Sequence, residues 1–350
     1  SLHAFAALLD AIGSVDRPAL VLLDDCQWAD ELTLKLISEW HRRQDQKNGR
    51  GRHVMVVVAF RPEDVPAGHL LGTLRPTVHL KLPPFRTRDV KRLAESMAGP
   101  LPAEAIAVTE RISGGSPYMA SAVLRGLVES GALVATESGW RVEPMAMADV
   151  QSARYAAAFL ARRIELLPPE TVRLLSVGAV LGMEFDLDFA KTLTGQPAAE
   201  AIAALDEARR RHLVWARARG TLCVFVHSKI RETLLGRLPE NDRKDLHRRA
   251  ALHLEKQEPD NIFDLAYHFD AAGDSERALP YALKAADQAR AQHSLEIAEQ
   301  QYRIAQRGTK EADRVTRYRI AEGLGDILML RGRYEKAAQE FEVAHGQRLA

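Results

Sequence analysis

The sequence predicts an α/β unit at its N-terminal end followed by a much longer helical region, so that the chain is mostly α overall. Two near-continuous apolar runs, 19–23 and 53–61, are typical of strands in a parallel sheet that is covered on both faces. The amphipathic pattern over 30–44 predicts a helix between them. After Pro83-Pro84 the β signal fades and helical spacing dominates.

Composition and charge narrow the class of protein. The chain has 350 residues, more than one hydrophobic core usually serves, so we expect two or three domains. A net charge of +1 gives no overall field that would favour nucleic acid or an anionic membrane. The two cysteines, Cys26 and Cys223, cannot build a disulfide framework or a CxxC metal pair, which predicts a cytoplasmic protein. No apolar run approaches the length of a membrane span.

The first part of the chain has clear boundaries between its predicted elements. A helix is predicted over 2–12 and ends at Gly13, and the helix over 30–44 is capped by Asp30. The apolar face of this second helix is expected to contain Leu32, Leu36 and Trp40. A third, weaker strand is predicted over 78–82, where the sequence reads VHLKL.

The middle of the chain alternates helices with turns. Helices are predicted over 87–99, 102–112, 118–130, 155–167, 170–181, 186–194, 198–211 and 228–237. Two short strands, 213–217 and 222–227, are expected to pair through a turn at 218–220. Several helices around one hairpin suggest a winged-helix unit. The basic run 209–211 ends a helix, where it offsets the macrodipole more readily than it binds DNA.

From about residue 240 onward the sequence predicts only helices, with small residues at TPR-like positions. The last unit matches seven positions of the 34-residue repeat: Leu324, Gly325, Gly332, Tyr334, Ala337, Phe341 and Ala344. An earlier unit has Gly273, Ala278 and Ala285, and a helix between them has Ala298, Tyr302 and Ala305. The spacing between these units is shorter than 34 residues, so the predicted array is irregular.

Two adjacent carboxylates, Asp24 and Asp25, follow the first buried strand directly. A strand of this form in an α/β context is typical of a Walker B motif, in which the first acid holds Mg²⁺ and the second polarises the attacking water. The carboxyl end of a strand is also where an open α/β sheet places its ligand. The structural alternative is a pair of acids that begins a turn and caps the next helix, although Asp30 is the better cap.

Arg61 ends the second apolar strand in the sequence AFRPED. Strands of a parallel sheet end at the same edge, so a cation is expected near the two acids, where a γ-phosphate would lie. The alternative is a solvated arginine that opens a loop.

These segments together resemble one family. The stretch LLDDCQWAD, then VVVAFRPED, then ISGGSPYMASAVLRGLVESGAL is similar to the signal-transduction ATPases with numerous domains, the STAND branch of AAA-like P-loop NTPases. The resemblance implies that Asp24 is the Mg²⁺ ligand, Asp25 the catalytic acid and Arg61 the sensor of the phosphate. It also implies that Pro117, in Gly115-Ser116-Pro117, lies against the adenine of ATP or ADP. Gln27, Trp28 and Asp30 would shape the turn between strand and helix.

His227 ends a strand and begins a helix in CVFVHSKIRETLL. The resemblance implies a histidine here that touches the β-phosphate of ADP and holds an off state, and an imidazole at a helix N-terminus is suited to this. The structural alternative is a histidine that caps the helix or packs in the winged helix.

The resemblance also implies how the chain is divided. Residues 1–84 would be the C-terminal half of a P-loop NTPase domain, 85–150 a helical lid, 151–255 a winged helix and 256–350 TPR-like repeats. The sequence GxxxxGK[ST], which holds the phosphates, occurs nowhere in the 350 residues. We therefore expect a fragment whose NTPase core lacks its N-terminal part, and which alone neither binds nor hydrolyses ATP.

The sequence leaves three functions open. The first is an ATP-dependent switch in a large signalling protein, most like the sensor histidine kinases or Ser/Thr kinases. Its array would bind a small-molecule or protein inducer, and the protein could self-associate. The second is a scaffold with a degenerate ATPase core. The third is a DNA-binding regulator that uses the winged helix, against which the near-neutral charge argues.

Overall fold

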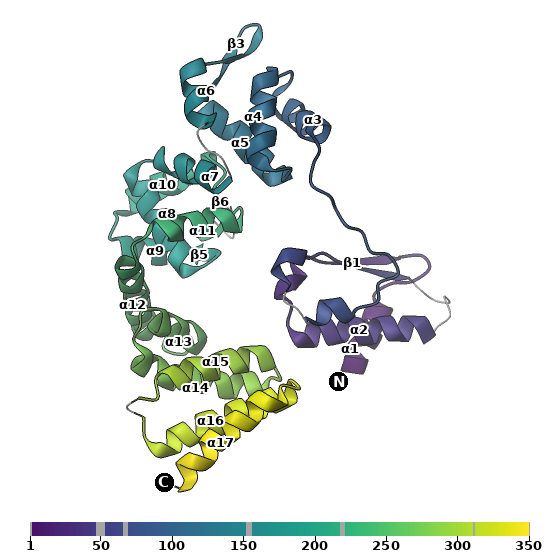
Figure 1. The fold of residues 1–350 in the computed structure, drawn as a ribbon, viewed down its shortest axis with the longest axis vertical. Coiled ribbons are helices and arrows are strands. Elements are labelled where there is room, and N and C mark those ends of the chain that lie inside the picture. The colour runs from purple at the N-terminus through teal and green to yellow at the C-terminus, as the bar shows by residue number, and fades with distance from the viewer. Residues whose placement is uncertain are drawn as a thin grey trace. The chain divides into compact units, whose positions relative to one another are not determined.

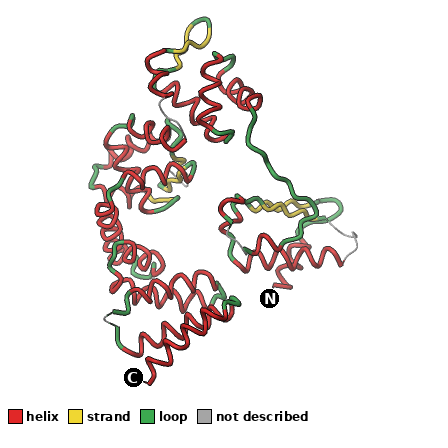
Figure 2. Tube along the Cα trace, viewed as in Figure 1, coloured by secondary structure: helices red, strands yellow, loops and turns green. Residues whose placement is uncertain are grey.

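The computed structural model describes residues 2–46, 53–65, 69–151, 156–217, 221–310 and 312–349. The chain divides into two compact units, one made of residues 81–253 and the other of residues 1–80 with 254–350. The prediction of a mostly helical chain is confirmed, and the strands form only small sheets (Figure 2). Within the described residues no helix combines the length and apolar character needed to cross a membrane.

The N-terminal segment contains a parallel pair of strands with helices beside it (Figure 1). Its regular elements are α1 (Leu2–Ala11), β1 (Ala19–Leu23), α2 (Glu31–Gln46) and β2 (Val54–Val58). The two strands pair in parallel from Ala19 opposite Val54 to Leu23 opposite Val58, as the two apolar runs predict. Because the connection between parallel strands must return the chain to the same end of the sheet, α2 provides the crossover.

The burial of this sheet differs from the prediction. Leu20 and Leu22 are 58% and 67% exposed, so β1 is covered on one face only and the expectation of a fully buried strand is wrong for the described residues. The covered face packs on α2 through Leu34 and Ile37. These residues, with Trp40, are the buried apolar residues of α2, whereas Leu32 and Leu36 of the predicted face are only partly buried.

The predicted third strand is absent. Residues 78–82 are described without regular secondary structure, and Val78, Leu80 and Leu82 are all strongly exposed. The alternation of apolar and polar residues is real, but a strand also needs a neighbour to accept and donate its backbone hydrogen bonds. No described strand pairs with this segment.

Residues 87–151 form what we call the helical subdomain. It contains α3 (Thr87–Ala98), α4 (Ala103–Ser113), α5 (Pro117–Glu129), the antiparallel strands β3 (Leu133–Thr136) and β4 (Gly139–Val142), and α6 (Pro144–Gln151). The sequence predicted the first three helices to within about two residues, as expected for helix ends. It did not predict the hairpin, whose strands are only four residues long.

Residues 156–253 form what we call the α/β subdomain. Its elements are α7 (Ala156–Glu165), α8 (Pro169–Leu181), β5 (Glu184–Asp186), α9 (Leu187–Thr194), α10 (Ala198–Arg210), β6 (Val214–Arg217), β7 (Leu222–Phe225), α11 (Ser228–Arg237) and most of α12 (Glu240–Gln257). Strand β7 lies between β5 and β6 in an antiparallel sheet. The hairpin was predicted but β5 was not, and the predicted turn at 218–220 lies outside the described residues.

The C-terminal array consists of α13 (Ile262–Ala271), α14 (Ser275–Ala291), α15 (Leu295–Arg307), α16 (Arg314–Leu330) and α17 (Tyr334–Leu349), each packed against the next. The small residues of the predicted repeat allow this packing. A Cβ atom at Gly325 would lie 2.6 Å from a ring carbon of Phe341, so these two repeat positions form one contact. Gly323 faces the buried ring of Tyr302 in the same way.

A buried histidine in this array makes its stability depend on pH. His268 of α13 is buried, and burial lowers its pKa from 6.5 to about 4. The folded state therefore binds fewer protons than the unfolded state between these values, so stability is full above pH 6.5 and falls as the pH falls toward 4. The loss from this group is about 3 kcal/mol.

We predict that His268→Gln flattens this dependence. Urea unfolding of the array, followed by hydrogen exchange in α13 and α14, should show a smaller loss of stability between neutral and acidic pH in the variant than in the wild type. The control is His345→Gln, which changes an exposed histidine of α17 and should leave the dependence intact. Equal pH dependence in wild type and His268→Gln would contradict the assignment.

Candidate functional site

The two carboxylates lie where the chain leaves β1. The ladder between the strands continues beyond their ends, because the Cys26 N–H donates to the Ala59 carbonyl at 2.9 Å and the Ala59 N–H donates to the Leu23 carbonyl at 2.8 Å. Between these bonds Asp25 adopts a left-handed conformation with φ 51° and ψ 38°. Its N–H donates to Asp24 Oδ1 at 2.9 Å, which fixes the two acids relative to each other. Aspartate is one of the few residues that accept this backbone conformation.

Gln27 joins the ends of the two strands. Its side chain is 6% exposed, its Nε2 donates to Asp25 Oδ1 at 2.8 Å, and its Oε1 accepts the Arg61 N–H at 3.2 Å. Both ends of one buried amide are therefore satisfied by residues from different strands. The family resemblance implies only a part in the strand-to-helix turn for this glutamine, whereas the structure shows that it bridges the two strand ends.

Arg61 lies beside Asp25, as the parallel arrangement predicts. The guanidinium Nε is 3.7 Å from Asp25 Oδ1, and both side chains are largely exposed. An ion pair in such a setting contributes little to stability, in the range of about 0–1 kcal/mol. The pair therefore contributes little to holding this edge of the sheet together.

An open cavity of about 410 Å³ adjoins the acids. It is lined by Leu22, Leu23, Asp24, Asp25, Cys26, Ala29 and Thr33. The Cys26 thiol is buried and donates to the Leu23 carbonyl at 3.4 Å. Burial, together with the charges of Asp24 and Asp25, raises the pKa of this thiol, so it is not poised as a nucleophile.

The carboxylates fit Mg²⁺ better than they fit a metal held by protein alone. The described residues contain no group of three His, Cys, Asp or Glu side chains that could hold a metal ion. Magnesium is commonly bound through one or two carboxylates, with water and substrate phosphates filling the other positions. Asp24 could supply one such carboxylate, and the phosphates would need a cradle that no GxxxxGK[ST] in this sequence provides.

Pro117 begins α5 in the helical subdomain, in the other compact unit from Asp24 and Arg61. Ser116 caps the helix by accepting the Met119 N–H at 3.3 Å. Gly115 has φ +79°, and a Cβ there would lie 2.8 Å from both the Phe85 carbonyl oxygen and Pro84 Cβ. The turn before Pro117 therefore requires glycine at position 115 and packs tightly against Pro84 and Phe85.

His227 takes the capping role that its sequence position allows. It is the N-cap of α11, and its Nδ1 accepts the Lys229 N–H at 3.1 Å. Its ring also stacks on Tyr118, with centroids 4.1 Å apart and planes 14° from parallel. Tyr118 directly follows Pro117 and was not predicted as a functional residue. An aromatic residue after the Gly-Ser-Pro turn was the available signal, but the sequence does not reveal its distant partner.

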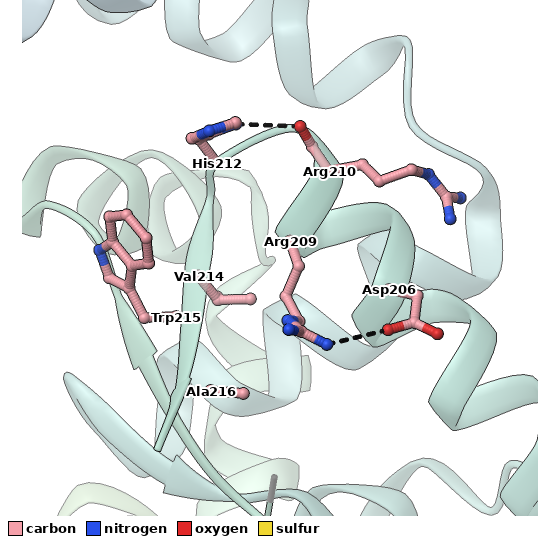
Figure 3. A pocket seen from close by; sticks show the side chains of 7 residues that line it. All are labelled: Asp206, Arg209, Arg210, His212, Val214, Trp215 and Ala216. Atoms are coloured by element: carbon pink, nitrogen blue, oxygen red, sulfur yellow. Dashed lines mark hydrogen bonds and ion pairs between the residues drawn. The ribbon is translucent and has the colours of Figure 1, made fainter.

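A second open cavity lies beside β6 (Figure 3). It measures about 430 Å³ and is lined by Asp206, Arg209, Arg210, His212, Val214, Trp215 and Ala216. Arg209 pairs with Asp206 at 3.2 Å, and Arg210 pairs with Glu207 of the same helix. Acids one turn earlier thus neutralise this basic helix end.

Comparisons with known proteins give structural likeness but no match by sequence family. No protein-family model matches the chain, and no curated protein matches it. Among solved structures, the chain is similar to a signal transduction ATPase with numerous domains that carries a tetratricopeptide repeat sensor, from Pyrococcus horikoshii, with 14% sequence identity and a TM-score of 0.49. The match covers 99% of this chain and 51% of the other, so this chain spans about half the length of that structure.

We predict that Gln27→Leu loosens the edge that carries the acids. The change removes both bonds of the buried amide and leaves the Arg61 N–H without its acceptor, at a cost of about 1–2 kcal/mol. Hydrogen exchange of residues 54–61 should accelerate. The control is Gln339→Leu, at an exposed position of α17, where exchange should stay as in the wild type. Unchanged protection of Arg61 in Gln27→Leu would refute the bridging role.

Proposed function

We propose that the edge formed by Asp24, Asp25 and Arg61 is the metal and γ-phosphate end of a nucleotide site in a signal-transduction ATPase. The observation that carries this proposal is their convergence. Two acids from one strand and a cation from its parallel neighbour meet at one sheet edge, beside an open cavity, and a buried glutamine joins them. This is the edge at which parallel α/β sheets bind ligands.

The residues of the edge have separable tasks in this proposal. When bound, Mg²⁺ would neutralise charge on the phosphate oxygens, and Asp24 would hold its coordinated water. Asp25 would orient the attacking water and accept its proton. Gln27 donates to Asp25 Oδ1, and the Arg61 guanidinium lies nearest to the same oxygen, so the carboxylate is held from one side. When the terminal phosphate is present, Arg61 would leave Asp25 and bind the phosphate instead.

The remaining parts complete a switch in this proposal. The parts would be the core at 1–84, the lid at 85–150, the winged helix at 151–255 and the TPR-like array at 256–350. Pro117 would contact the adenine, His227 would report ADP, and the array would bind an inducer or a partner protein. An output domain, such as a histidine or Ser/Thr kinase, would be regulated. We place this protein in the cytoplasm, and the phosphate cradle would come from polypeptide outside these 350 residues.

The experiment that tests this function is nucleotide binding. Titration of the purified 350-residue chain with Mg·ATP should show no binding tighter than about 1 mM, because the phosphate cradle is missing from its sequence. The polypeptide encoded upstream, if it supplies GxxxxGK[ST] after a strand, should confer binding in the micromolar range when joined to the chain. Tight binding by the 350 residues alone, or none by the joined protein, would overturn the proposal. The second outcome would favour the scaffold.

A substitution at Asp25 tests the catalytic assignment in the joined protein. Asp25→Asn should lower ATP hydrolysis by at least about 100-fold while Mg·ATP still binds, because the acceptor of the water proton is lost. Asparagine tolerates the left-handed backbone, so the loop geometry should persist. The control is Asp16→Asn, in the exposed turn before β1, which should hydrolyse ATP at the wild-type rate. Normal turnover by Asp25→Asn would exclude it as the catalytic acid.

A further inference from the structure

Helix α5 of the helical subdomain is attached to the α/β subdomain at both of its ends. Its second residue, Tyr118, stacks on His227 at the start of α11. Its last residue, Glu129, is bound by Arg163 of α7. Both contacts lie within the compact unit of residues 81–253. The two attachments differ in kind, because one is an aromatic stack and the other a buried ion pair.

The attachment at Glu129 is a rigid one. The Arg163 side chain is 4% exposed, and its Nε and Nη2 donate to the two Glu129 oxygens at 2.9 Å each. The same Nη2 also donates to the Arg211 carbonyl at 2.9 Å, which reaches the loop between α10 and β6. A bidentate guanidinium–carboxylate pair has a fixed geometry, and removing one partner would strand a buried charge.

Helix α7 strengthens this end further. Phe159 and Leu160, in its middle, belong to the core of the helical subdomain, whereas Ile164 belongs to the core of the α/β subdomain. Gly126 of α5 leaves room for the Phe159 ring, because a Cβ at this position would clash with the ring. The subdomains therefore share a helix near Glu129, and this junction does not depend on the stack at Tyr118.

The attachment at Tyr118 is a stack on one ring, the imidazole of His227. Two contacts of different kinds orient His227. The Lys229 N–H donates to its Nδ1, and the face of the Tyr118 ring fixes the plane of the imidazole. An Nδ1 that accepts a hydrogen bond carries no proton, so the neutral ring has its proton on Nε2. Tyr118 thereby holds the imidazole in the orientation in which the Lys229 N–H selects the tautomer of His227.

We propose that Tyr118 is the positioning residue for His227, and that it links the Gly115–Pro117 turn to this histidine. The role of His227 toward a phosphate rests on the proposed function, but the positioning itself does not. Tyr118 lies one residue from Pro117 in the first turn of α5. A ligand that shifts this turn therefore shifts the ring against which His227 lies, while the Glu129 attachment keeps the subdomains joined.

The surroundings of Tyr118 suit a fixed platform. Its ring packs against both subdomain cores. Burial raises the pKa of its hydroxyl to about 12, so the phenol stays neutral, with the positive charge of Arg163 acting weakly in the opposite direction. A neutral aromatic ring retains the face on which an imidazole stacks.

The test is made on the full 350-residue chain without nucleotide, so that its outcome is independent of ATP binding. The tautomer of His227 is read from imidazole ¹⁵N–¹H correlation spectra, with the signal assigned by its loss in His227→Gln. In the wild type we expect protonated Nε2 and unprotonated Nδ1. In Tyr118→Ala the two tautomers should mix, and the Lys229 amide should exchange about fivefold faster because the cap weakens.

Two further variants separate positioning from core filling. Tyr118→Phe keeps the ring and should restore the wild-type His227 spectrum. Glu129→Gln, on the same helix, should lower the unfolding temperature yet leave the His227 tautomer unchanged, because it alters only the other attachment. The inference is overturned if Tyr118→Ala keeps the wild-type tautomer and exchange rate, or if Tyr118→Phe shows the same loss as Tyr118→Ala. If the 350-residue chain passes this test but the protein joined to its upstream polypeptide does not bind Mg·ATP, the proposed function alone is contradicted.

Discussion

The parallel pairing of β1 and β2 is the constraint on which the candidate site depends. Two further backbone bonds, through Cys26 and Ala59, carry the ladder beyond the strands. The chain must then turn away between them, and it does so through the left-handed backbone of Asp25. The acids are thereby placed at the sheet edge by main-chain geometry, before any side-chain contact is considered. Gln27 and Arg61 then add to a position that already exists.

The same sheet has one apolar face that α2 does not cover. Leu20 and Leu22 of β1 and Met55 of β2 are exposed, whereas parallel sheets are normally covered on both sides. Val78 and Leu80 show the same character in an extended segment without a strand partner. Apolar side chains on one face of the sheet and on this extended segment are therefore both open to solvent.

Much of this region could be predicted from the sequence, because the information is local or follows from a general rule. Apolar runs indicate the strands, and the rule that parallel strands end at one edge places Arg61 near Asp25. The buried face of α2 could not be predicted fully, because Leu34 and Ile37 are selected over Leu32 by what lies opposite them, chiefly Cys26 and Leu71. The prediction of a third strand was wrong for the same reason, because alternation of apolar and polar residues does not supply a neighbouring strand to pair with.

Contacts between distant residues were the part that the sequence could not reveal. Tyr118 and His227 are far apart in the chain, and neither has a spacing pattern that would pair them. In the sequence Arg163 is one of two adjacent basic residues on α7, although its burial with Glu129 distinguishes it. Such pairs depend on how subdomains meet, so composition and periodicity carry no record of them. The bridging of Gln27 is a shorter-range example of the same limit.

The two attachments of α5 differ in how much displacement each tolerates. A bidentate ion pair in a buried setting tolerates little displacement, because each hydrogen bond weakens steeply as its angle departs from linear. A stacked pair of rings slides with less cost, because its attraction is spread over many atoms and lacks a sharp angular dependence. In our proposal, a displacement of the turn at Pro117 therefore reaches His227 through this stack, while the ion pair at Glu129 keeps its geometry. Since His227 is the partner of Tyr118, a shift of the turn at Pro117 changes the setting of the imidazole before it disturbs the junction at Glu129.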